Sequence, residues 1–120
     1  MRIMVVDNDT SLTRSLEILL TDRGHEVAGF DDPRRAAETI EQGIHPEVLI
    51  LDYCMPQMSG QQFLQRLRLH LRPDCRIILL SGHLDDVPHA DLVRLGVSSF
   101  LPKPPDLNAI CGQVAFPEVS

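Results

Sequence analysis

The stretch Val48-Leu49-Ile50-Leu51-Asp52 places a carboxylate directly behind a continuous apolar run. A short run without polar alternation is typical of a strand that is buried on both faces, as in a parallel sheet covered by helices. Ligands of such sheets bind beyond the carboxyl ends of the strands. Asp52 is therefore a candidate nucleophile at the end of a buried strand.

Further apolar runs lie on both sides of this stretch, and segments with helical spacing alternate with them. The predicted strands are Ile3 to Val6, Val27 to Phe30, Val48 to Leu51, Ile77 to Leu80 and Val97 to Leu101. The predicted helices run from Asp9 or Thr10 to Gly24, from Asp32-Pro33 to Gly43, through Phe63, Leu64, Leu67 and Leu71, from Val87-Pro88 to Gly96, and through Leu107, Ile110, Cys111 and Val114. Strand-then-helix units need right-handed crossovers, so the pattern predicts an α/β, doubly wound (βα)5 fold with a five-stranded parallel sheet.

Composition bounds the class of protein. Eleven basic against 17 acidic residues give a net charge of −6, which repels phosphate backbones and argues against direct nucleic-acid binding. The three cysteines lack paired spacing, as expected for free thiols in a reducing compartment. No apolar stretch reaches membrane-spanning length, so we expect a cytoplasmic protein without a membrane partner. A length of 120 residues fits one domain, 1–120. The sequence stops a few residues after the fifth helix, so we expect either a single-domain protein or one part of a longer protein.

Polar groups follow the other strands as Asp52 follows its own. Asp7-Asn8-Asp9 closes the first strand, Ser81 closes the fourth and Lys103 follows the fifth. Because the ends of parallel strands converge, these groups are expected to form one patch with Asp52. Carboxylates with one lysine suit a divalent cation such as Mg²⁺ bound together with a phosphoryl group. A carboxylate nucleophile in that setting yields an acyl phosphate.

The chain resembles the receiver domain of bacterial two-component response regulators over essentially its whole length. The motifs that carry the resemblance are Leu51-Asp52-x-x-Met55-Pro56-x-Met58-Ser59-Gly60, Val6-Asp7-Asn8, Leu80-Ser81-Gly82 and Gly96-Val97-x-x-Phe100-x-Pro102-Lys103-Pro104. The resemblance implies the strand order 2-1-3-4-5 of flavodoxin-like and receiver-like sheets. It also implies a regulatory phosphoacceptor, not an enzyme, with at most slow self-dephosphorylation.

By the same resemblance, Asp52 accepts a phosphoryl group from a sensor histidine kinase or a phosphotransfer protein. Asp7, Asn8, Asp52 and the backbone carbonyl of Cys54 are expected to surround Mg²⁺. Lys103, held by a cis Lys103–Pro104 bond, and Ser81 are expected to bind the phosphoryl group. Ser81 and Phe100 occupy the switch positions. The resemblance also places kinase specificity on the first helix and pairing of two phosphorylated copies on the fourth-helix and fifth-strand face.

Two residues depart from the family pattern. Asn8 stands where the family usually has a second acid, which should weaken Mg²⁺ binding because one negative charge is missing. Asp9 would compensate only if its side chain turned into the site, and its role as a helix cap argues against that. Pro105 replaces a common apolar residue and should stiffen the loop.

Two other functions stay open at this point. Asp7-x-Asp9 also resembles the motif of haloacid-dehalogenase-type phosphatases, in which Asp7 would be the nucleophile and Asp9 the general acid or base. That interpretation leaves the motif after Asp52 unexplained. Asn8 motivates a third hypothesis, a receiver-like interaction module that does not take phosphate. Asp85-Asp86 are expected to cap the fourth helix. The receiver resemblance implies a kinase-facing surface on the first helix with residues such as Leu12, Thr13, Ser15 and Leu16.

Overall fold

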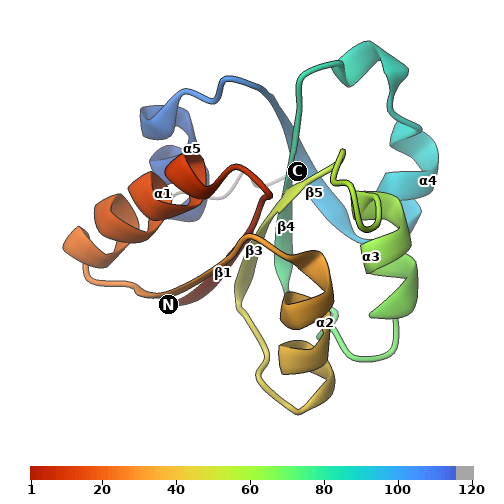
Figure 1. Cartoon of the computed structure of the whole chain (residues 1–120), viewed down its shortest axis with the longest axis horizontal. Helices are drawn as coiled ribbons and strands as arrows, with labels where there is room; N and C mark the ends of the chain where they lie inside the picture. Colours follow the sequence, from red (N-terminus) through yellow and green to blue (C-terminus); the bar gives the residue numbers. More distant parts are fainter. Residues whose placement is uncertain (116–120) are drawn as a thin grey trace.

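A computed structural model describes residues 1–115 and shows a parallel sheet between two layers of helices (Figure 1). The strands are β1 (Arg2–Val6), β2 (Glu26–Phe30), β3 (Val48–Asp52), β4 (Arg76–Ser81) and β5 (Val97–Pro102). The helices are α1 (Thr10–Asp22), α2 (Pro33–Glu41), α3 (Gly60–Arg66), α4 (His89–Arg94) and α5 (Leu107–Ala115), with a 3-10 turn, η1 (Leu84–Asp86), before α4. The last residues of the predicted domain 1–120 lie outside the described residues, so its end stays a prediction.

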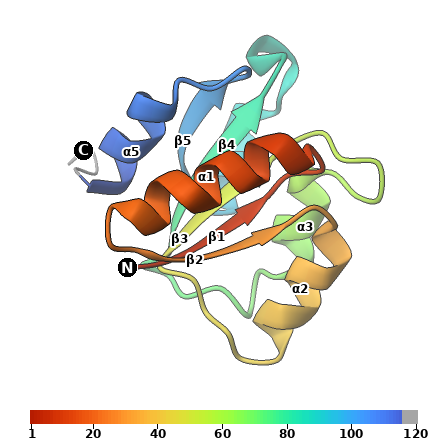
Figure 2. The same ribbon diagram turned by 60° about the vertical axis from the view of Figure 1, so that its left-hand side comes forward.

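The sheet has the order β2-β1-β3-β4-β5, and every pair of neighbouring strands is parallel. This confirms the predicted fold class and strand order. Helices α1 and α5 cover one face, and α2, α3 and α4 lie on the other (Figures 1 and 2). Strand β3 is buried along its whole length. Leu49 and Leu51 belong to the core on the α2 and α3 side, whereas Val48 and Ile50 belong to the core on the α1 and α5 side. This is why the run carries no polar alternation.

Capping side chains fix where the first three helices begin. The Asp9 carboxylate accepts a hydrogen bond from the Leu12 N–H at 3.1 Å, and Asp32 caps α2 with Pro33 in its first turn. Ser59 and Gln62 form a reciprocal capping box at the start of α3. The expected caps at Asp9 and Asp32 are therefore confirmed. No helix in the described part of the chain is long and apolar enough to cross a bilayer.

Three local expectations were wrong. Asp85 and Asp86 do not cap α4, because they lie in η1 and the N-cap position is held by Pro88, which offers no side-chain acceptor. Helix α3 ends at Arg66, earlier than the apolar spacing predicted, although Leu67 is still fully buried. Packing thus kept the apolar contact while the regular helix gave way to turns.

The third error concerns the surface of α1. Thr13 is only 5% exposed and Leu16 is completely buried, so neither belongs to a surface that a kinase can reach. Both side chains lie on the face of α1 that packs onto the sheet, together with Leu20. Ser15 is exposed and Leu12 half-buried, so these two stay compatible with a docking surface.

Candidate functional site

Three charged side chains meet beyond the carboxyl ends of the strands. The ammonium nitrogen of Lys103 lies 2.9 Å from Oδ2 of Asp7 and 3.3 Å from Oδ2 of Asp52. Asp7 and Asp52 are 1% and 2% exposed, whereas the Lys103 side chain retains 23% exposure. The sequence placed these residues far apart, and the parallel sheet brings them together as expected.

The backbone around Asp52 is fixed from both sides. The Tyr53 N–H donates to the carbonyl of Leu80 at 2.9 Å, which ties the acceptor loop to β4. The Gly60 N–H donates to the carbonyl of Tyr53 at 2.7 Å, so α3 begins directly against the end of β3. The Cys54 N–H lies 3.3 Å from Oδ1 of Asp52 and orients the carboxylate. Cys54 itself is exposed.

Gly60 is required by this close approach. A Cβ atom at position 60 would lie 2.8 Å from the Asp52 carbonyl oxygen and 3.0 Å from Cα of Tyr53, both backbone atoms that cannot move aside alone. We expect Gly60→Ala to lower the free energy of unfolding by about 1–3 kcal/mol, as overpacking does. Urea denaturation measures the loss.

Gly112→Ala provides the matched control. Gly112 lies within α5, and a Cβ atom there would meet nothing within 4 Å. This change should be neutral or stabilising, because alanine favours helix more than glycine does. Equal effects of the two substitutions would show that Gly60 is not constrained by Asp52.

Asp7 is held by three groups. Its N–H donates to the carbonyl of Phe30, its Oδ1 accepts from the Asp9 N–H at 2.9 Å, and its carbonyl accepts from the Thr13 hydroxyl at 3.0 Å. Oδ2 is buried, pairs with Lys103 by charge and receives no hydrogen bond of good geometry from residues 1–115. Thr13 was not among the predicted site residues, although its spacing on the buried face of α1 points to a role beside the site.

Burial dominates the electrostatics of Asp52. It raises the pKa of this carboxyl from 3.8 to about 6, with the nearby negative charge of Asp7 adding to the increase and the Lys103 ammonium opposing it. Burial acts to lower the pKa of Lys103, but the two carboxylates outweigh it and raise that pKa above its ordinary value. The site therefore holds more negative charge than its one ammonium neutralises, which favours a bound cation.

The remaining predicted residues lie around this centre. Ser81 is 4% exposed at the end of β4, and its Oγ accepts from the His83 N–H at 3.0 Å. The Lys103 N–H donates to the Ser81 carbonyl, and the Lys103–Pro104 bond is cis, as expected. Phe100 is half-buried on β5 with its ring centroid 4.4 Å from that of His89. The switch roles of Ser81 and Phe100 stay predictions.

The donor set suits Mg²⁺ better than a metal that needs a full protein cage. Among residues 1–115, no cluster of three or more His, Cys, Asp or Glu side chains is arranged to hold a metal. Two carboxylates converge, Asn8 lies exposed beside them, and Asp9 is used as a cap. Mg²⁺ commonly takes one or two carboxylates and keeps several waters, so the Asp7 and Asp52 carboxylates fit it, and Asn8 and the Cys54 carbonyl stay predicted ligands.

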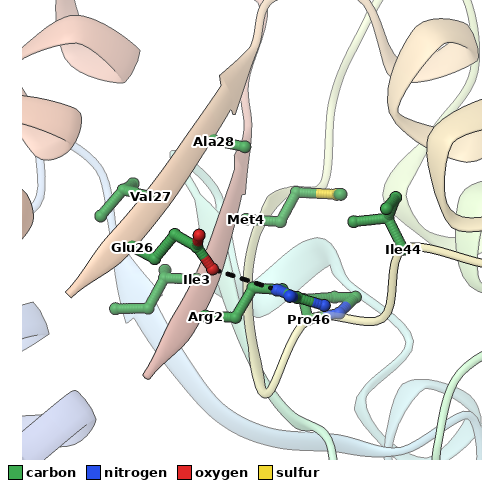
Figure 3. A pocket seen from close by; sticks show the side chains of 8 residues that line it. All are labelled: Arg2, Ile3, Met4, Glu26, Val27, Ala28, Ile44 and Pro46. Carbon is green, nitrogen blue, oxygen red and sulfur yellow. Dashed lines mark hydrogen bonds and ion pairs between the residues drawn. The ribbon is translucent and has the colours of Figure 1, made fainter.

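An apolar hollow lies elsewhere on the molecule. Figure 3 shows it at the amino ends of β1 and β2, lined by Ile3, Met4, Val27, Ala28, Ile44 and Pro46 and bordered by the Arg2–Glu26 ion pair. This is the opposite end of the sheet from Asp52. It contains none of the predicted site residues, so we place no chemistry there.

Comparison with known proteins identifies the family. A model of the response regulator receiver domain matches residues 3–115. The chain is 41% identical to a protein-glutamate methylesterase/protein-glutamine glutaminase of Vibrio vulnificus, over 90% of this chain and 32% of that protein. It is 25% identical to the chemotaxis protein CheY of Thermotoga maritima, over 86% of this chain and 85% of that protein.

Solved structures agree. A response regulator receiver protein from Pseudomonas putida superposes with a TM-score of 0.83 at 29% identity, over 95% of this chain and 94% of that one. The chain spans only about a third of the length of the methylesterase relative, so the activity in that protein's name is not transferred here. Because the family model covers nearly all of the described residues, the chain belongs to the response regulator receiver domains of two-component signalling systems.

Proposed function

We propose that Asp52 accepts a phosphoryl group from the phosphohistidine of a sensor histidine kinase or a phosphotransfer protein. The observation that carries this proposal is the convergence of Asp52, Asp7 and Lys103 at the ends of β3, β1 and β5. A carboxylate oxygen of Asp52 attacks phosphorus, the phosphorus–nitrogen bond to histidine breaks, and its electron pair stays on the imidazole. The product is an acyl phosphate.

Each neighbour has a role in this transfer. Asp7, Asn8, Asp52 and the Cys54 carbonyl would hold Mg²⁺, which when bound neutralises charge on the phosphoryl oxygens. Lys103 pairs with a further phosphoryl oxygen through its ammonium, and its remaining exposure leaves it accessible from the open side of the site. The Ser81 hydroxyl moves toward the phosphoryl group and donates to it; its oxygen accepts from the His83 N–H, so its own hydrogen is free for this bond. That movement, with a rotation of Phe100, would alter the α4 and β5 surface.

The partners follow from the proposed switch. The altered α4 and β5 surface is where two phosphorylated copies would pair, and the exposed part of α1 is where the kinase would dock. We propose no direct nucleic-acid or membrane contact by this domain, in line with its net charge of −6. The chain itself would catalyse nothing beyond slow self-dephosphorylation, and would act in the cytoplasm, where it meets its phosphodonor.

Incubation with a small acyl phosphate donor and Mg²⁺, followed by mapping of the acid-stable, alkali-labile label, tests the function. We expect the label on Asp52. Label on Asp7 would support the phosphatase alternative. No label would support a receiver-like interaction module that does not take phosphate. Neither the family match nor the relatives favour the phosphatase. In addition, the Asp9 carboxylate that it needs as acid or base is engaged by the Leu12 N–H.

Asn8→Asp should tighten Mg²⁺ binding by about tenfold, because it adds a carboxylate beside a site that binds a cation. Tyr53 is the only tyrosine, the chain has no tryptophan, and Tyr53 directly follows Asp52. Its fluorescence therefore reports metal titration without added dye. Asn108→Asp makes the same charge change on α5 and should leave the affinity unchanged. An unchanged affinity in Asn8→Asp would refute a role of position 8 in metal binding.

A further inference from the structure

Thr13 is one of the few buried polar residues of the described chain, and its hydroxyl faces the loop that carries Asp7 and Asn8. It is 5% exposed, and Oγ1 lies 3.0 Å from both the Asp7 and the Asp9 carbonyl oxygens. The contact with Asp9 is the usual back-bond of a threonine in a first helical turn. The contact with Asp7 is different, because it reaches across the helix start to the end of β1.

The Asp7 carbonyl has no other hydrogen-bond donor among residues 1–115, whereas the Asp9 carbonyl also accepts from the Thr13 N–H at 3.0 Å. The hydroxyl is thus the group that satisfies Asp7. Because the peptide between Asp7 and Asn8 is planar, holding this carbonyl also fixes the direction in which Asn8 leaves the strand. The bond therefore sets how both residues face Asp52.

Gly29 provides the space that Thr13 occupies. Helix α1 packs against β2 (Figure 2), and a Cβ atom at position 29 would lie 2.6 Å from Cγ2 of Thr13. It would also collide with the Glu17 carboxylate, which is flexible enough to move. Thr13 is β-branched and has little freedom to turn aside. Any side chain at position 29 would therefore displace Thr13 from this position.

From these contacts we propose that Thr13, seated over Gly29, is a positioning residue for Mg²⁺ binding. It touches neither metal nor phosphate, and acts by holding the Asp7–Asn8 backbone in place. The inference rests on the proposed function, because it assumes that Asp7 and Asn8 bind the metal. The positioning of the Asp7–Asn8 backbone by Thr13 matters more in this chain than in a site with three acids. Asn8 contributes only a neutral oxygen, so good geometry must replace the missing charge.

Mg²⁺ titration of Thr13 variants, followed by Tyr53 fluorescence, tests the proposal. Thr13→Val keeps the shape and removes the hydroxyl, and should weaken Mg²⁺ binding about tenfold, as the loss of a group that orients a metal ligand does. Thr13→Ser restores the hydroxyl and should bind within about twofold of the parent protein. Gly29→Ala, which retains the Thr13 hydroxyl but displaces Thr13, should also weaken binding.

Thr39→Val is the matched control, because Thr39 makes the same kind of back-bond to the Arg35 carbonyl at 2.8 Å on α2, away from the site. It should leave the Mg²⁺ affinity unchanged and the stability close to that of the parent protein, because the bond it removes is exposed. Parental Mg²⁺ affinity in folded Thr13→Val would overturn the positioning role while label on Asp52 leaves the proposed function standing. If the parent protein neither bound Mg²⁺ nor took label, the proposed function and this inference would fall together.

Discussion

Asp52→Asn should abolish labelling by a small acyl phosphate donor, lowering it by at least about 100-fold, because an amide oxygen is not a competent nucleophile. The substitution keeps the size of the side chain, and the loop around it is held by backbone bonds from Tyr53 and Gly60 that do not involve the carboxylate. Loss of label would then report lost chemistry and not lost structure. Phosphate release after brief alkaline treatment gives the measurement.

Asp9→Asn is the matched control for this experiment. The Asp9 side chain caps α1, and asparagine caps helices about as well as aspartate does. Labelling should therefore persist in this variant. If Asp52→Asn retained its label and Asp7→Asn lost it, the nucleophile would be Asp7 and the receiver mechanism would be wrong for this chain.

The centre of the site was predictable because strand topology decides it. Asp7, Asp52 and Lys103 each follow an apolar run, and parallel strands end at one edge of a sheet. The sequence alone therefore supports their meeting, which the distances from Lys103 to both carboxylates show. Helix starts were predictable wherever a capping side chain precedes the first turn, as at Asp9 and Asp32.

Contacts between elements were not predictable in the same way. The approach of Gly60 to the Asp52 carbonyl depends on how α3 packs against β3. The position of Thr13 on α1 depends on the space left by Gly29 on β2. Thr13 and Leu16 do not lie on the exposed side of α1, because the helical phase that buries Leu20 turns both of them toward the sheet. Asp85 and Asp86 were misplaced because the loop folds into η1 before α4 begins.

Removal of the Asp52 carboxylate should stabilise the fold even as it removes the function. The raised pKa of Asp52 means that the folded protein holds this proton more tightly than the unfolded chain. Stability that depends on Asp52 is therefore greatest at low pH and falls as pH rises from about 4 through about 6. Above that range, the buried charge lowers the free energy of unfolding by about 1–3 kcal/mol, the amount that such a rise in pKa represents.

We therefore expect metal-free Asp52→Asn to exceed the parent protein in stability by about 1–3 kcal/mol near pH 8, with the gain vanishing toward about pH 4. Urea denaturation in a chelating buffer across this range measures the difference, and comparison of two variants of one chain cancels most other titrations.

Asp32→Asn is a control of opposite sign. The bonds to Arg34 lower the pKa of Asp32, so loss of the Asp32 carboxylate should destabilise the fold at high pH. A gain independent of pH would mean that shape or packing, not the buried charge, separates Asp52 from asparagine. A gain that fades between about pH 6 and pH 4 would show that the metal-free fold tolerates an unfavourable carboxylate. In that case bound Mg²⁺ would offset a negative charge that the fold already holds at the end of β3.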